Sequence, residues 1–167
     1  MKTATKEIPA YKLMYLDQVY LLTTAHGAKE KGFKPHIIPQ LWATPVSFRP
    51  PLIAVAVAKD RFTHHILMET KEFVLNIPGS ELAPRVWACA PPGDGGDKFT
   101  RSKLTPIKAK KVKAPLVKEC LGAIECKVVG KIDAGDHTVF IGEAVATHKF
   151  KTGTVMINAA GHHEFKV

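Results

Sequence analysis

The sequence of 167 residues predicts a mainly β fold, an antiparallel barrel with short helices at its periphery. Three observations lead to this prediction. Roughly six segments rich in β-branched and apolar residues are separated by Gly and Pro. Only two short segments carry helix signals, and strand follows strand more often than strand follows helix. A parallel βαβ arrangement needs regular alternation, so the pattern favours an antiparallel sheet.

Composition and length indicate one globular domain over residues 1–167. Apolar residues make up 46% and charged residues 23%, which excludes a disordered chain or a rod. No apolar stretch approaches the roughly 20 residues that span a bilayer, and residues 1–11 lack the apolar core of a signal peptide. The three cysteines contain no CxxC pair and are expected to be buried thiols. We therefore expect a cytoplasmic protein without a membrane partner.

The first half of the chain supplies three extended segments. Residues 19–26 are rich in β-formers and predict a strand. Residues 36–48 are also extended, but Pro39 and Pro45 exclude a regular central strand there. Residues 52–58 form a nearly continuous apolar run, which is typical of a buried strand.

Two short helices are predicted in the middle of the chain. Thr63 is a candidate N-cap for a helix over residues 64–70, and a strand follows over 72–77. Ser80 is expected to cap a second helix that ends at Ala88.

The second half of the chain predicts a long hairpin. After a loop at 91–97, residues 117–132 indicate a long strand, and 133–136 form a hairpin turn. Residues 137–150 are the returning strand, and 155–159 are expected to add a last short one.

The net charge of +9 is concentrated in one segment. Residues 98–118 contain eight basic and no acidic residues. Such a segment attracts anions, either nucleic acid or a phosphorylated small molecule. Residues 101–118 contain no aromatic residue that could stack on bases, so we interpret them as a solvated basic connection. A basic β-barrel that binds nucleic acid stays as the less favoured alternative.

Signature motifs of several enzyme classes are missing from the sequence. It has no GxGxxG after a strand, no phosphate-binding P-loop, no GxSxG and no HExxH. The paired histidines at 64–65 and 162–163 could each supply only one metal ligand, because adjacent side chains point in different directions. We predict no metal site.

Two stretches are unusual. Residues 41–51 combine a tryptophan, two hydroxyl residues and three prolines, and the prolines rigidify a segment whose backbone groups can face a flat ligand. In residues 135–143, His137 opens a strand directly after a tight turn. Taken alone, His137 would be expected to hydrogen-bond its own turn.

Together with three further motifs, these stretches resemble the flavin reductase-like, FMN-binding split-barrel family, which includes archaeal ferric reductases and flavoredoxin. The resemblance covers about residues 19–150. The motifs, which occur in the family's order, are 42–48 with 50–51, 61–64, 72–78, 97–99 and 135–143. The resemblance implies a six-stranded Greek-key barrel, a homodimer, FMN near the dimer interface and the use of NAD(P)H.

The resemblance also implies a set of cofactor-binding residues. The segment that would line the flavin and its ribityl phosphate supplies His36, Pro39, Gln40, Trp42, Ala43, Thr44, Pro45, Val46 and Ser47. The phosphate end would be completed by Arg61, Thr63 and His64. A helix N-terminus and a planar guanidinium both suit a phosphate.

Two residues in matching motifs are the catalytic candidates. Lys98 would stabilise the negative charge of the reduced flavin, and it also counts among the cofactor-binding residues. His137 would serve the nicotinamide side or a proton transfer. The chain departs from many relatives, which carry Asn in place of His36 and a small residue followed by Thr in place of Pro39 and Gln40. No Cys lies close to Thr44, although some ferric reductases have one there.

The sequence thus predicts an FMN-binding oxidoreductase that passes hydride from NAD(P)H to flavin and electrons on to free flavin or a ferric complex. A flavoredoxin-like electron carrier without a pyridine nucleotide site is the alternative within the family. The expected partners are small molecules and a second copy of the chain, with no nucleic acid. The sequence leaves open the final electron acceptor, the choice between NADH and NADPH, and whether flavin is prosthetic group or substrate.

Overall fold

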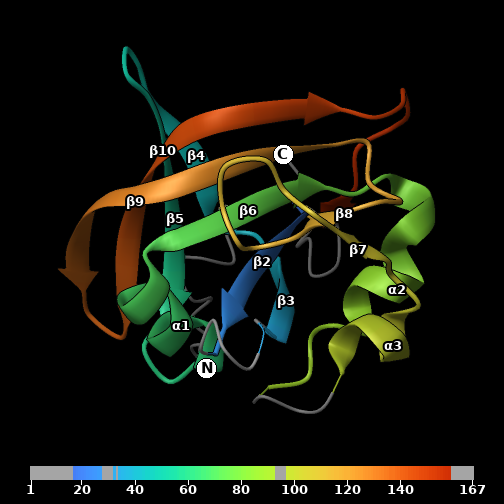
Figure 1. Cartoon of the computed structure of the whole chain (residues 1–167), viewed down its shortest axis with the longest axis horizontal. Helices are drawn as coiled ribbons and strands as arrows, with labels where there is room; N and C mark the ends of the chain where they lie inside the picture. Colours follow the sequence, from blue (N-terminus) through green and yellow to red (C-terminus); the bar gives the residue numbers. More distant parts are fainter. Residues whose placement is uncertain (1–16, 28–31, 33, 93–96, 159–167) are drawn as a thin grey trace, which may run out of the picture.

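A computed structural model describes residues 17–27, 32, 34–92 and 97–158, and its fold is mainly β (Figure 1). Seven antiparallel strands form the main sheet in the order β3-β2-β6-β9-β10-β5-β4. They are β2 (Tyr20–His26), β3 (Lys34–Gln40), β4 (Ala43–Phe48), β5 (Pro51–Ala58), β6 (Glu72–Ile77), β9 (Gly122–Ala134) and β10 (His137–Lys149). The antiparallel split barrel is confirmed. The main sheet has seven strands rather than six, because segment 36–48 contributes to two of them.

Short elements surround this sheet. The helices are α1 (Phe62–Thr70), the 3₁₀ turn η3 (Ser80–Leu82), α2 (Ala83–Trp87) and α3 (Lys98–Ser102). Two small strand pairs are β1 (Asp17–Gln18) with β11 (Ile157–Asn158), and β7 (Pro106–Ile107) with β8 (Leu116–Val117). In the described part of the chain, no helix has the length and apolar character needed to cross a membrane. The helix predicted from Ser80 to Ala88 is split into η3 and α2, and α3 was not predicted.

Prolines occupy both edges of the main sheet. Strand β3 lies at one edge and carries Pro35 and Pro39, and β4 lies at the other edge and carries Pro45. Proline cannot donate a ladder hydrogen bond, so edge strands tolerate it best. This confirms that segment 36–48 does not form a regular central strand.

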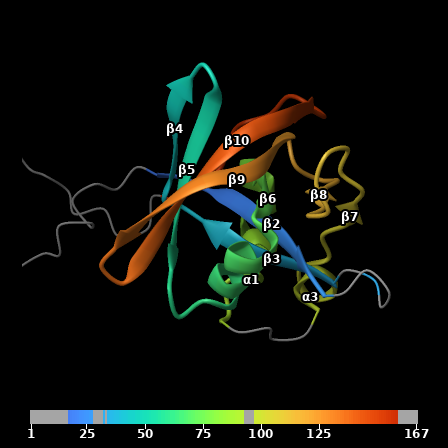
Figure 2. The ribbon, with the colours of Figure 1, turned by 60° about the vertical axis from the view of Figure 1, so that its left-hand side comes forward.

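Two hairpins dominate the shape of the sheet. The β4–β5 hairpin projects from the body of the molecule (Figure 2). Phe48, near the turn of this hairpin, is 95% exposed. The β9–β10 hairpin has 13 residues in each strand and turns at Gly135, whose φ of 60° suits glycine. The predicted turn at 133–136 is therefore confirmed, although Asp133 and Ala134 still belong to β9.

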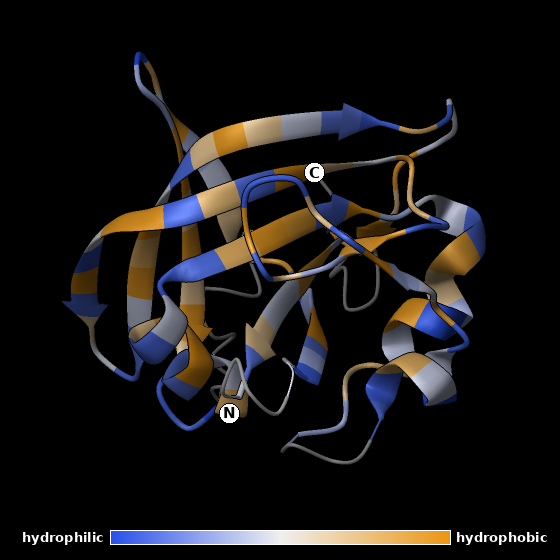
Figure 3. Ribbon diagram, in the orientation of Figure 1, coloured by the Kyte–Doolittle hydropathy of each residue, from blue (hydrophilic) through white to orange (hydrophobic). Residues whose placement is uncertain are grey.

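Both faces of the sheet are buried over part of its area, and long apolar stretches follow its strands (Figure 3). Leu22 of β2 packs with Phe73 and Phe140 in one apolar cluster, whereas its neighbour Leu21 packs with Phe99 in another. Adjacent strand residues point to opposite faces, so β2 lies between two cores. The cysteines are free and fully buried, as expected, and burial raises the pKa of the thiols of Cys120 and Cys126 to about 12.

The Arg and Lys residues of segment 101–118 are exposed to solvent, as expected for a solvated basic connection, whereas backbone amides of the same segment are bonded to the body of the protein. Between β7 and β8, the backbone amides of Lys110, Lys111 and Val112 donate to the buried carboxylate of Glu125 at 2.9, 2.6 and 3.1 Å. Nε2 of His148 lies 2.7 Å from the same carboxylate. Burial opposes ionisation of Glu125, but these hydrogen bonds outweigh it and hold its pKa below the usual range. The carboxylate of Glu125 on β9 thus holds the loop between β7 and β8 against the main sheet.

Candidate functional site

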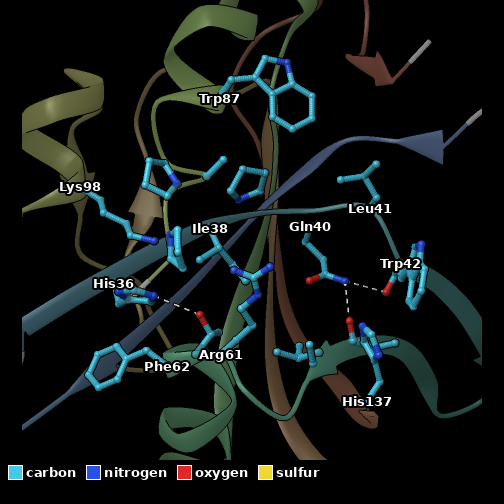
Figure 4. A pocket seen from close by; sticks show the side chains of 18 residues that line it. His36, Ile38, Gln40, Leu41, Trp42, Arg61, Phe62, Trp87, Lys98 and His137 are labelled. Atoms are coloured by element: carbon cyan, nitrogen blue, oxygen red, sulfur yellow. Dashed lines mark hydrogen bonds between the residues drawn. The ribbon is translucent and has the colours of Figure 1, made fainter. Parts of the chain in front are cut away.

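A cavity of about 350 Å³ brings together residues from six parts of the chain (Figure 4). Its walls come from β3 and the segment after it, the end of β5, the start of α1, the end of α2, the start of α3 and the start of β10. The predicted residues that line it are His36, Pro39, Gln40, Trp42, Arg61, Thr63, Lys98 and His137.

One wall of the cavity combines a hydroxyl, an imidazole and a guanidinium. Nε2 of His36 on β3 lies 3.1 Å from Oγ1 of Thr63 on α1, and both side chains are buried. The predicted N-cap role of Thr63 is wrong, because α1 begins at Phe62 and Arg61 is the N-cap residue. The guanidinium of Arg61 is partly exposed, with Nε 3.8 Å from the carboxylate of Asp60. Arg61 thus lines the cavity, and its ion pair with Asp60 is long.

Lys98 approaches the cavity from α3, and the residues beside it explain its position. Asp97 is the N-cap of α3 and accepts hydrogen bonds from the amides of Phe99 and Thr100 at 3.0 and 3.1 Å. Phe99 is buried in the core. The Lys98 side chain is 3% exposed, and its Nζ donates to the carbonyl of Cys89 at 3.1 Å. Burial lowers the pKa of Lys98, so the cavity holds an ammonium group that is poorly solvated.

Gln40 presents a fixed acceptor to the cavity. Its Nε2 donates to the carbonyls of Trp42 and Ala56 at 2.9 and 3.0 Å (Figure 4). These two bonds use both amide hydrogens and fix the orientation of the side chain. The remaining Oε1 can only accept a hydrogen bond. The same bonds tie the segment after β3 to β5.

An aromatic pair forms another part of the wall. The rings of Trp42 and His137 lie 4.7 Å apart with an angle of 35° between their planes. Nδ1 of His137 is 2.7 Å from the carboxylate of Asp136, and this hydrogen bond is the main reason that the pKa of Asp136 is lowered. An ionised carboxylate accepts, so Nδ1 carries the proton and Nε2 is the nitrogen left for other partners.

Several predicted residues lie outside this cavity. His64 lies beyond the cavity-lining part of α1, and its Nε2 is 2.9 Å from Oγ1 of Thr138. Burial, followed by the charge of His65, lowers the pKa of His64, so this residue is a poor candidate for a phosphate contact. Ala43 and Thr44 line a neighbouring apolar cavity instead. The rest of the predicted segment lies along β4, which leads away from the site: Pro45, Val46 and Ser47.

Trp87 is a cavity residue that the sequence reasoning missed. It lies at the end of α2, is 41% exposed and faces the site together with Ala90, Pro91 and Pro92. The signal in the sequence is a tryptophan placed shortly before the Pro91-Pro92 loop. The predicted loop at 91–97 is described only at its ends, since 93–96 lie outside the described residues.

The residues present fit a flat ring that carries a phosphate. Arg61, His36 and Thr63 supply donors suited to a phosphate, and Lys98 adds a buried cation. Trp42 and His137 offer flat surfaces, and Gln40 offers a fixed acceptor for a ring N–H.

The chain is similar in sequence and in fold to several known proteins. The model of the flavin reductase like domain family matches residues 14–163. An uncharacterized protein of Archaeoglobus fulgidus is 40% identical over 129 residues, which cover 75% of this chain and 73% of that protein. The ferric-chelate reductase (NAD(P)H) of the same organism is 29% identical over 153 residues, covering 91% and 86%. The solved NADH:FAD oxidoreductase of Streptomyces globisporus shares the fold, with a TM-score of 0.79 at 20% identity over 93% of each chain.

Proposed function

Because the chain belongs to the flavin reductase-like domain family, we propose that it is an FMN-binding oxidoreductase. In this proposal it takes hydride from NAD(P)H and passes electrons to free flavin or a ferric complex. The observation that carries the proposal is the cavity itself, which joins phosphate donors, a buried ammonium and a stacked aromatic pair in one space. Its buried free thiols support a cytoplasmic location.

Each part of the wall has a defined task in this proposal. Arg61 and the His36–Thr63 pair bind and orient the phosphate. Gln40 fixes the ring edge through its acceptor oxygen, and Trp42 covers part of the ring surface. When bound, FMN supplies the capacity to accept a hydride and to release electrons singly or in pairs. The poorly solvated ammonium of Lys98 favours the more negative, reduced state of the cofactor.

His137 is the residue placed to handle a proton. Asp136 fixes its tautomer, so Nε2 is the nitrogen that can bond to a ligand or accept a proton. The ring contact with Trp42 restricts the orientation of the imidazole. The alternative is a structural His137 that only fixes the turn, and kinetic data on a variant separate the two.

A titration tests the phosphate assignment. We expect the protein to bind about one FMN per chain and to bind riboflavin, which lacks the phosphate, more weakly. Arg61→Leu should reduce FMN affinity by about tenfold or more, because a hydrogen bond to a charged group is worth about 1.5–3 kcal/mol. Riboflavin affinity should hardly change in this variant. Equal affinities of the native protein for FMN and riboflavin would contradict the assignment.

Rapid mixing with NADH or NADPH tests the reaction. Bleaching of the flavin absorbance within the turnover time supports the reductase. Stable absorbance with both nucleotides, together with reduction by dithionite, would support the electron carrier instead. No flavin absorbance and no FMN binding would overturn both.

We further propose that the chain forms a homodimer through the β4–β5 hairpin. The hairpin exposes Phe48 and Val46, and an apolar cavity of about 470 Å³ beside it shares Trp42 with the site. Exposed apolar surface of this kind is typical of protein interfaces. Phe48→Asp should shift sedimentation at micromolar concentration from a dimer to a species of 18.3 kDa. A native protein that sediments only as the monomer would refute the dimer.

A further inference from the structure

The two tryptophans of the chain both lie at the same cavity, yet only one has a ring partner in the described structure. Each is 41% exposed, which is high for a side chain whose large apolar surface is usually covered. Trp42 stacks on His137. Within the described residues, Trp87 has no aromatic ring contact. Trp87 lines the cavity and is 41% exposed, so its indole offers surface to a ligand there.

The position of Trp87 is fixed by its backbone neighbours. The carbonyl of Trp87 accepts from the amide of Ala90 at 3.0 Å. The next carbonyl, of Ala88, accepts from Nε of Arg101 at 3.0 Å, and that of Cys89 accepts from Nζ of Lys98. Three consecutive carbonyls are thus bonded, two of them by cationic side chains. The turn after α2 is held in place, so the indole is presented without a large cost in backbone ordering.

The arrangement of the walls matches a ligand with two rings joined through phosphates. Figure 4 shows Trp87 at the top of the cavity and Trp42 with His137 at its lower right. The guanidinium of Arg61 lies near the centre of the view, and the ammonium of Lys98 lies to its left. FMN has one planar ring, which the Trp42 side accommodates, and its phosphate is drawn to the cations. A second aromatic surface beyond these cations has no task for FMN alone.

We propose that Trp87 is a stacking site for the adenine of an adenosine diphosphate moiety. This inference rests on the proposed function and adds a second ring to it. Two kinds of molecule that could take part in the proposed reaction carry this moiety: FAD and the nicotinamide dinucleotides. In both, the diphosphate lies between two planar rings, so the cations meet the phosphates and the indole meets the purine.

Binding measurements on matched variants separate the two tryptophans. Trp87→Leu keeps apolar bulk but removes the stacking surface, Trp87→Phe retains a ring, and Trp42→Leu is the control at the other wall. We expect Trp87→Leu to weaken FAD or NAD⁺ binding about tenfold and to change FMN affinity less than about twofold. Trp87→Phe should restore most of the loss. Trp42→Leu should weaken FMN and FAD equally.

The two sources of the adenine are distinguished by separate titrations. FAD is titrated into the protein without flavin, and NAD⁺ into the protein loaded with FMN. If Trp87→Leu weakens only FAD binding, Trp87 stacks on the adenine of the flavin. If it weakens only NAD⁺ binding, Trp87 stacks on the adenine of the nicotinamide dinucleotide. Either result supports the proposal. The proposal would be overturned if Trp87→Leu weakened the binding of FMN, FAD and NAD⁺ equally, or if it weakened none of them.

A spectroscopic readout needs no catalysis. In Trp42→Phe, Trp87 is the single tryptophan, so its fluorescence reports directly on the stack. Addition of AMP should quench this emission in a saturable manner, and ribose 5-phosphate should not. Absence of quenching at millimolar AMP would contradict the proposal, even if FMN binds. Quenching by AMP in a protein that binds no flavin would refute the proposed function and leave the adenine site standing. Thermal unfolding of every variant checks that the fold is intact.

Discussion

The cavity and the loop between β7 and β8 both concentrate positive charge, but they hold it in opposite ways. In the loop, backbone amides point inward to Glu125, and the side chains of Lys110 and Lys111 are exposed to solvent. In the cavity, the side chain of Lys98 is itself buried, and it is bonded to a carbonyl rather than to a carboxylate. The contrast teaches that a lysine-rich segment can be held through its backbone amides while its charges stay in solvent, whereas the charge of Lys98 is buried beside the cavity.

Removal of the anchor should have the largest effect on stability. Glu125→Ala leaves three backbone amides without their acceptor, and it removes the partner of His148. We expect the free energy of unfolding to fall by about 3–5 kcal/mol, measured by urea denaturation. FMN affinity of the folded variant should stay near that of the native protein, because the loop does not line the cavity.

A matched control sharpens this prediction. Glu69→Ala removes an exposed carboxylate on α1 and should change the unfolding free energy by no more than about 0.5 kcal/mol. Similar losses in the two variants would mean that Glu125 has no special role as an anchor.

In the cavity, a substitution should affect the reaction and spare the fold. His137→Ala should slow flavin reduction by NAD(P)H about 10²-fold in stopped-flow measurements, because it removes the oriented Nε2. FMN affinity and the melting temperature should change little. A lower melting temperature with unaltered reduction kinetics would instead assign His137 to the turn alone.

The buried ammonium should act on the cofactor potential. Lys98→Met removes a positive charge that favours the reduced cofactor, so the midpoint potential of bound FMN should fall by about 30 mV or more. That shift corresponds to about 1.4 kcal/mol for a two-electron couple. Lys103→Met, which removes an exposed lysine just after α3, is the control. Equal potentials in the native protein and Lys98→Met would place this charge too far from the ring.

The smallest expected effect is on the pH dependence of stability. The pKa of Glu125 is lowered in the folded state, so its contribution is complete above the ordinary glutamate value of about 4.3. This contribution is lost as the pH falls through the folded-state pKa. The stability difference between the native protein and Glu125→Gln should therefore be constant near neutral pH and shrink in acid, measured by urea denaturation at a series of pH values. A difference that grows in acid would contradict the lowered pKa.

Much of the fold could be predicted from the sequence because strong local signals determine it. The apolar run at 52–58 and the turn before His137 define β5 and the β9–β10 hairpin. The prolines indicate edge strands. The pairing of β7 with β8 could not be predicted, since it depends on the contact between Glu125 and amides more than ten residues away.

The site was predicted best where a motif has a local physical cause. Asp97 caps α3, Lys98 lines the cavity and Phe99 is buried in the core. The position of Lys98 therefore follows from its two neighbours in the same motif. His64, expected at the phosphate end, does not line this cavity, and its Nε2 lies 2.9 Å from Oγ1 of Thr138 instead. Trp87 was missed because its role depends on how α2 packs in three dimensions.

The prolines at the sheet edges have a consequence for assembly. Pro35 and Pro39 are four residues apart, so their missing donors lie on the same edge of β3, and an edge strand accommodates prolines best where that edge faces away from its neighbour β2. Pro45 likewise removes a backbone donor from β4, in the exposed β4–β5 hairpin. A further strand cannot extend the ladder on either side without losing hydrogen bonds. The prolines thus disfavour open-ended addition of strands at these edges, and in the proposed dimer the β4–β5 hairpin would make contact through its exposed side chains.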